Sequence, residues 1–115
     1  MLKNVPVVLE GYKLRVTEEP APKTYTNDTG STEMAFDSSG AQLFVVSLLM
    51  KQRPSEQGGR VGKGFEVKVT LETDPSHADI EEGQLVELIN PRISQWAMNG
   101  REGVSMRAAG IKHAA

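Results

Sequence analysis

The sequence predicts an almost all-β domain. Apolar and polar residues alternate along several short segments, which is the period of a half-buried strand. Turn residues recur between these segments at the spacing of β proteins. The longest apolar run, "LFVVSLLM" at residues 43–50, has the length of a strand rather than of a membrane helix. A chain of 115 residues is long enough to bury one core, so residues 1–115 are expected to form a single domain.

The first half of the chain contains one clear strand and one polar segment. Residues 12–19 alternate apolar with polar side chains, which predicts a half-buried strand. We expect this strand to end at the prolines of residues 20–22, because proline cannot donate to a strand ladder. Residues 23–37 are polar and rich in turn residues, so they predict an exposed irregular strand or loop.

A central hairpin is predicted over residues 42–73. Residues 42–52 are apolar on both faces, as expected for a strand in the middle of a curved or closed sheet. Residues 65–73 alternate, with Phe65 and every second residue after it facing inward. The connection at 53–64 is rich in glycine and cations and predicts a flexible basic loop.

The last third predicts one helical turn, one strand and one hairpin. Asp-Pro and an acidic turn favour a short helical turn over residues 76–82, before the strand "QLVELIN". Asn99-Gly100 lies between two alternating segments and is a strong hairpin signal. In its second strand Val104, Met106 and Ala108 are expected on the core face.

About five main strands and at most one short helix fit a five-stranded Greek-key barrel of the OB type. A small open sandwich is the alternative architecture.

Several functional classes find no support. The absence of cysteine removes disulfides, thiolate metal sites and cysteine nucleophiles. The glycine-rich run 58–64 does not match the spacing of a phosphate-binding loop, and it precedes a strand rather than a helix. We therefore expect no enzyme activity, no cofactor and no metal site. The N-terminus lacks a signal peptide's apolar core, which predicts a cytoplasmic protein without membrane contact.

The charges are sorted along the chain. Residues 51–68 and residues 91–115 each carry a net charge of +3, whereas residues 71–90 carry −6. Because a polyanion responds to the local field, a basic face is possible on a chain whose total charge is −2. If the two basic segments lie on opposite faces, a role in protein assembly is favoured instead.

Single-stranded nucleic acid requires cations along the backbone and exposed aromatic rings on which bases stack. Trp96 could alternatively cap one end of the barrel, Tyr25 could pack instead of stacking, and the loop cations could simply be solvated. The candidate nucleic-acid-binding residues are Tyr25, Lys51, Arg53, Arg60, Lys63, Arg92, Trp96, Arg101 and Arg107.

Two stretches carry a resemblance to a known family. The pattern D-x-x-G-x-x-L-F-x-V at 37–46 and the ending W-x-x-x-G-R-x-G-V-S-x-R-A at 96–108 resemble small OB-fold single-stranded-DNA-binding proteins of plasmids, conjugative elements and phages, especially those of actinobacteria. The resemblance implies a non-catalytic protein that coats single strands during replication or transfer of a mobile element. We also expect a homo-oligomer, a dimer or tetramer. The long acidic tail of the better-known bacterial proteins is not seen, so recruitment of replication enzymes through such a tail is not expected.

Two functions from different classes remain open. The preferred hypothesis is sequence-tolerant binding of single-stranded DNA, with RNA as a variant because 2′-hydroxyl recognition leaves no short motif here. The alternative is a structural or adaptor β-barrel that mediates protein–protein assembly through exposed strand edges.

Overall fold

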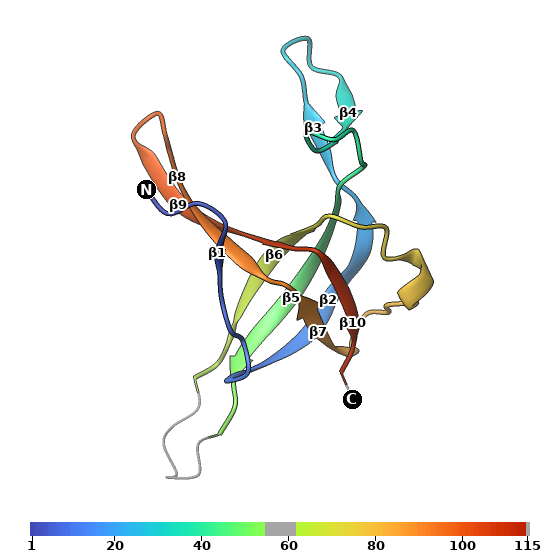
Figure 1. Ribbon diagram of the computed structural model, residues 1–115, viewed down its shortest axis with the longest axis vertical. Coiled ribbons are helices and arrows are strands. Elements are labelled where there is room, and N and C mark those ends of the chain that lie inside the picture. Colours follow the sequence, from blue (N-terminus) through green and yellow to red (C-terminus); the bar gives the residue numbers. More distant parts are fainter. Residues whose placement is uncertain (55–61, 115) are drawn as a thin grey trace.

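The computed structural model describes residues 1–54 and 62–114 of the chain. Most of the basic loop 53–64, including Arg60, lies outside the described residues. The predicted flexibility of this loop therefore concerns residues outside the described ones. The described residues form strands and one 3₁₀ helix (Figure 1). The elements in chain order are β1 (Val5–Pro6), β2 (Tyr12–Pro22), β3 (Thr24–Thr26), β4 (Thr32–Met34), β5 (Phe44–Gln52), β6 (Phe65–Leu71), η1 (Ser76–Ala78), β7 (Leu85–Ile89), β8 (Arg92–Met98), β9 (Arg101–Ala108) and β10 (Gly110–His113).

The main sheet has the strand order β1-β8-β9-β6-β5-β2-β7-β10. Strands β2, β5 and β6 form an antiparallel meander, β2 also pairs with β7, and β6 pairs with β9 in parallel. The register of β7 on β10 continues that of β8 on β9 without a shift, so β7 and β8 are halves of one bent strand, as are β9 and β10. The β8–β9 pair lies near one edge of the sheet and the β7–β10 pair lies at the other. Because each bent strand runs from one pair to the other, the sheet curls into a partly open barrel of the OB type.

The expected all-β fold of OB type is confirmed, but the number of strands differs. The backbone turns at Asn90, where φ is +51°, and this bend divides one predicted strand into β7 and β8. The polar segment 23–37 forms its own two-stranded hairpin, β3 with β4. The single short helical turn lies at Ser76–Ala78, within the predicted range. No helix in residues 1–54 and 62–114 is long and apolar enough to cross a membrane.

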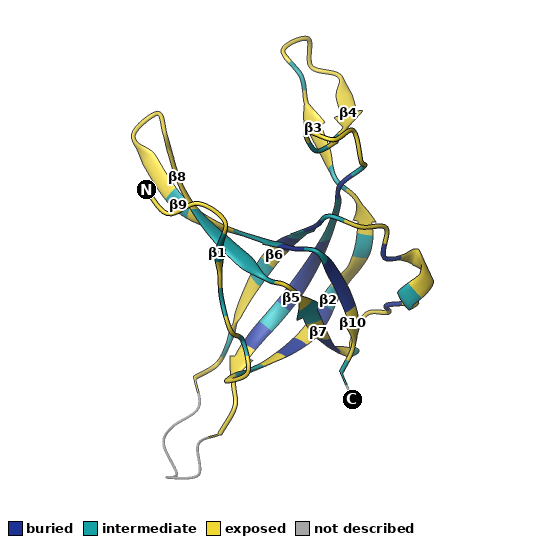
Figure 2. Cartoon of the chain, viewed as in Figure 1, coloured by how far each residue is buried: buried dark blue, intermediate teal, exposed yellow. Residues whose placement is uncertain are grey.

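The core is built by the inward side chains of the alternating strands (Figure 2). Along β5 and β6 these are the residues that the two-residue period places inward, and their burial supplies the hydrophobic contribution to stability. The largest of the fully buried side chains are Val16, Val46, Leu48, Val69 and Leu71.

The first strand was predicted over residues 12–19 and to stop at the prolines that follow, but β2 includes these prolines and runs to Pro22. The pairing of β2 with β5 shifts register between Glu18 and Ala21, and Pro20 lies within that shift. The ladder is already interrupted there, so the missing proline N–H removes no regular ladder bond.

Two residues expected in the core are exposed. Val104 keeps the face shared with Met106 and Ala108, but it is 62% exposed. Phe65 begins β6 and is 56% exposed. Both lie where a strand extends beyond the barrel, so the two-residue period fixes the face of the side chain but not its burial.

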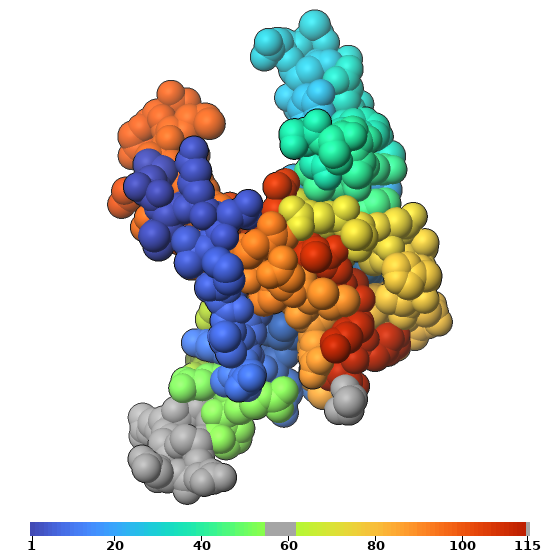
Figure 3. Space-filling model, viewed as in Figure 1, coloured from blue at the N-terminus to red at the C-terminus, as the bar shows by residue number. Residues whose placement is uncertain are grey.

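Two hairpin arms project from the same end of the barrel (Figure 1). The first arm, residues 24–34, is β3 with β4, and the second arm, residues 94–105, is the outer part of the β8–β9 hairpin. In the second arm Asn99 and Gly100 have φ of +52° and +77°, which confirms the predicted tight turn. The space-filling view is hollowed between the two arms (Figure 3).

Candidate nucleic-acid interface

A polar groove lies at the base of the two arms. It has a volume of about 350 Å³, and its lining includes Lys23, Thr70, Ser94, Ser105 and Arg107. These residues come from the start of the first arm, from β6, and from both strands of the second arm. The groove therefore joins segments that are far apart in the sequence, and it offers cations and hydroxyl groups but no carboxylate among its lining residues.

The groove opens onto one outer face of the sheet. Thr70 pairs with Arg107 across the parallel β6–β9 ladder, and their neighbours Val69 and Ala108 are completely buried. Since side chains alternate between faces, Thr70 and Arg107 point outward, and Lys68 points outward with them. We call Lys23, Lys68 and Arg107 the cationic face.

This arrangement answers the question posed by the charge pattern. Lys68 belongs to the basic segment 51–68 and Arg107 to the basic segment 91–115. The two segments thus contribute to the same face, through a parallel strand pair that joins them directly. Opposite faces would have favoured the adaptor function, and Lys68 and Arg107, one cation from each segment, lie on the same face.

Lys23 is held in the groove by a hydrogen bond. Its Nζ donates to Oγ1 of Thr70 over 2.9 Å, and its side chain is half-buried. Burial, and then the positive charge of Arg107, lower the pKa of Lys23 from its ordinary value of 10.5. Two cations therefore repel each other across the groove, and an anion bound between them would relieve this repulsion.

Glu72 partly balances the arginines. Its carboxylate forms an ion pair with Arg92 and lies 3.7 Å from Nε of Arg107. The Arg92 side chain is only 13% exposed, and it also donates to the carbonyl of Asn90 over 3.2 Å. Arg107 is 37% exposed and remains accessible from the groove. Of these two predicted residues, Arg107 is the one placed to meet a ligand, whereas Arg92 is engaged within the protein.

Trp96 lies on the second arm, on the same sheet face as Arg107. It pairs with Gly103 across the β8–β9 ladder, and two-residue steps lead from Gly103 to Ser105 and Arg107. The tryptophan is 43% exposed and is not part of the core cluster. It therefore does not cap the barrel, and part of its ring is exposed to solvent.

Tyr25 lies on the first arm and is 50% exposed. Its hydroxyl donates to Oε2 of Glu33 on the neighbouring strand over 2.9 Å, and this hydrogen bond is the main cause that raises the pKa of Tyr25. Lys23 and Tyr25 are two residues apart on an extended, paired segment, so they leave the same side of it. Each arm therefore carries one exposed aromatic ring that could stack on a base.

The other predicted residues lie farther from the groove. Arg101 is exposed beside the turn of the second arm. Lys51 is exposed near the end of β5, and Lys63 is exposed just before β6. Both lie at the end of the β5–β6 hairpin that points away from the arms (Figure 2). Arg60 lies outside the described residues.

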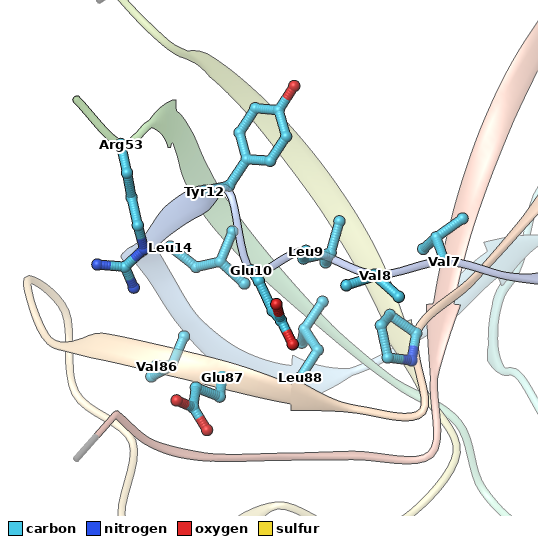
Figure 4. Close-up of a pocket in the computed structure, with 11 residues that line it drawn as sticks. Val7, Val8, Leu9, Glu10, Tyr12, Leu14, Arg53, Val86, Glu87 and Leu88 are labelled. Atoms are coloured by element: carbon cyan, nitrogen blue, oxygen red, sulfur yellow. The ribbon is translucent and has the colours of Figure 1, made fainter. Parts of the chain in front are cut away.

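Arg53 belongs to a different cavity. It lines a space of about 400 Å³ between the N-terminal segment and β7, together with apolar residues such as Leu9, Leu14 and Val86 (Figure 4). This cavity shares no lining residue with the groove. The structure therefore separates Arg53 from the cationic face.

The sequence interpretation missed Lys23, Lys68 and Thr70 as candidate residues. Lys68 was recognisable as an outward residue from the alternation of 65–73, but its place on the same face as Arg107 depends on a parallel pairing that leaves no local signal. Lys23 follows the end of β2 and gave no pattern of its own.

No protein-family model and no curated protein matches the sequence. Among solved structures, the chain is similar to the crystal structure of a small single-stranded DNA-binding protein from Streptomyces coelicolor. The TM-score is 0.50 and the sequence identity is 12%, over 98% of this chain and 96% of that chain. The likeness is one of fold, and it extends over almost the whole of both chains.

Proposed function

We propose that this protein binds single-stranded DNA without strong sequence preference. The DNA strand lies in the groove at the base of the two arms and continues along the cationic face. Lys23, Lys68 and Arg107 contact phosphates, while Trp96 and Tyr25 stack on bases. The observation that carries the proposal is the parallel pairing of β6 with β9, because it places Lys68 of one basic segment and Arg107 of the other on the face that bears Trp96.

The groove suits an unpaired strand better than a duplex. Stacking on Trp96 or Tyr25 requires a base whose flat face is free, and bases within a duplex are already stacked on each other. The likeness of fold to the small single-stranded DNA-binding protein from Streptomyces coelicolor adds support from a different kind of observation.

The proposal extends to a biological role. On the resemblance of the sequence motifs, the protein coats single strands during replication or transfer of a mobile element, as a homo-oligomer of two or four chains. Lys51 and Lys63 then prolong the contact toward the far end of the β5–β6 hairpin. Sedimentation with and without oligonucleotide measures the oligomeric state.

A fluorescence titration tests the proposed binding. Oligo-dT should quench the emission of Trp96, the only tryptophan, and affinity should fall steeply as salt is raised, because released counterions drive part of the binding. A duplex of equal length should bind more weakly. The absence of both quenching and a mobility shift at low salt would refute the proposal and leave the adaptor function as the better one. Oligo-rU in a parallel titration shows whether RNA is bound as well.

A further inference from the structure

Gly103 lies directly under the indole ring of Trp96. A Cβ atom built on Gly103 would lie 2.6 Å from Cζ2 and 2.8 Å from Cε2 of Trp96, much closer than any real contact allows. The two residues face each other across the β8–β9 ladder. The indole therefore rests on the backbone of the opposite strand in space that any larger residue would fill.

The backbone conformation does not require glycine at this position. Gly100, in the turn of the same arm, has φ of +77°, which other residues rarely adopt, but Gly103 has no such positive φ. Glycine also weakens a strand, because it has no side chain to pack and loses more conformational freedom on folding. The feature of the structure that calls for glycine at residue 103 is therefore the indole of Trp96.

We propose that Gly103 is a positioning residue that holds the indole of Trp96 against β9 as a preformed surface for base stacking. This inference rests on the proposed function. An indole that rests on the opposite strand loses less rotational freedom when a base stacks on its exposed side. The same contact keeps the ring on the face of the sheet that carries Arg107, so a stacked base and a bound phosphate can belong to one strand.

The alternative is that Trp96 covers Gly103 only to stabilise the hairpin, as aromatic residues do beside glycines in sheets. The two explanations differ in what a methyl group at residue 103 does to DNA binding. In the stabilising role, Gly103→Ala shifts the melting temperature and leaves the affinity of the folded protein unchanged. In the positioning role, the affinity falls although the barrel remains folded.

The test compares four proteins with the wild type: Gly103→Ala, Trp96→Ala, the double variant and Gly11→Ala. Gly11 is a matched control, because a Cβ there meets nothing within 4 Å and its φ is not positive. Oligo-dT affinity is measured by anisotropy of a labelled oligonucleotide, which does not depend on the tryptophan signal. Far-UV circular dichroism confirms the fold of each variant.

We expect Gly103→Ala to weaken oligo-dT binding by about fivefold or more, within the range of a lost base stack, without changing the salt dependence. Gly11→Ala should bind within about twofold of the wild type, the ordinary effect of a neutral surface change. In the Trp96→Ala background the Gly103→Ala change should have almost no further effect, because the ring that it displaces is gone.

Acrylamide quenching of the free protein gives a second measurement that does not depend on DNA. The indole of Gly103→Ala should be more accessible than that of the wild type, because the methyl group lifts it from β9. Unchanged affinity of Gly103→Ala, or an equal loss in the presence and absence of Trp96, would overturn the inference while wild-type binding upholds the proposed function. If the wild type itself does not bind oligo-dT, the proposed function fails instead.

Discussion

Lys23 and Thr70 lie 47 positions apart in the sequence, and a hydrogen bond of 2.9 Å joins their side chains. The bond fixes the base of the first arm to β6, the strand that also pairs with Arg107. The ammonium group of Lys23 is thereby held near Arg107, whose positive charge contributes to lowering the pKa of Lys23.

Two substitutions of Lys23 test whether its positive charge contributes to DNA binding. Lys23→Gln should weaken binding of oligo-dT and reduce the slope of log affinity against log salt by about 0.7, the value for one phosphate contact with a single strand. Lys23→Arg keeps the charge and should retain most of the slope. Anisotropy titrations at several salt concentrations measure both. An unchanged slope in Lys23→Gln would show that this side chain does not meet a phosphate.

The pKa of Lys23 predicts a dependence on pH. Because the pKa in the folded protein is lowered from 10.5, the unfolded chain binds more protons between the lowered value and 10.5. The free energy of unfolding therefore gains a contribution from Lys23 as pH rises through this window, and the contribution is absent below it. A bound phosphate should restore the proton, so oligo-dT affinity should fall as pH rises through the same window. Lys23→Arg, which stays protonated, should lose this part of the pH dependence, and equal curves for both proteins would contradict the prediction.

Arg107 and Arg53 should differ in their effect on DNA binding. Arg107 lines the groove, whereas Arg53 lines the separate cavity next to Leu14 and Val86. Arg107→Ala should weaken oligo-dT binding by about fivefold or more and reduce the salt slope by about 0.7. Arg53→Ala, an equal loss of charge, should have a smaller effect on both quantities. Equal losses in the two variants would mean that total charge, rather than the cationic face, controls binding.

Core and arm residues should differ in their effect on stability. Leu48 is completely buried, so Leu48→Ala should lower the free energy of unfolding by about 2–5 kcal/mol. Val104 is 62% exposed on the second arm, so Val104→Ala should change it by less than about 0.5 kcal/mol. Urea denaturation followed by circular dichroism measures both. A large loss in Val104→Ala would indicate that this face of the arm is covered in solution, for example by a second copy of the chain.

Local patterns predicted several elements well, because their causes are local. The Asn99-Gly100 turn follows from the positive φ values that a tight hairpin requires, and the inward face of β6 follows from the two-residue period. The 3₁₀ turn at Ser76–Ala78 follows Asp74-Pro75, where the backbone N–H of Ser76 donates to the Asp74 side chain over 2.9 Å. Burial was predicted less well, since Phe65 and Val104 keep the expected face but extend beyond the barrel.

By itself, the sequence determined the class of fold, the segments that form the central strands, the tight turn of the second arm and the presence of two basic segments. Tertiary structure decided which cations meet. The parallel β6–β9 pairing places Thr70 beside Arg107 and Lys68 on the same face, the Lys23–Thr70 bond joins two sides of the groove, and Arg53 lies in another cavity. The physical reason is that alternation and turn residues act over a few positions, whereas the pairing of distant strands depends on the closure of the whole sheet.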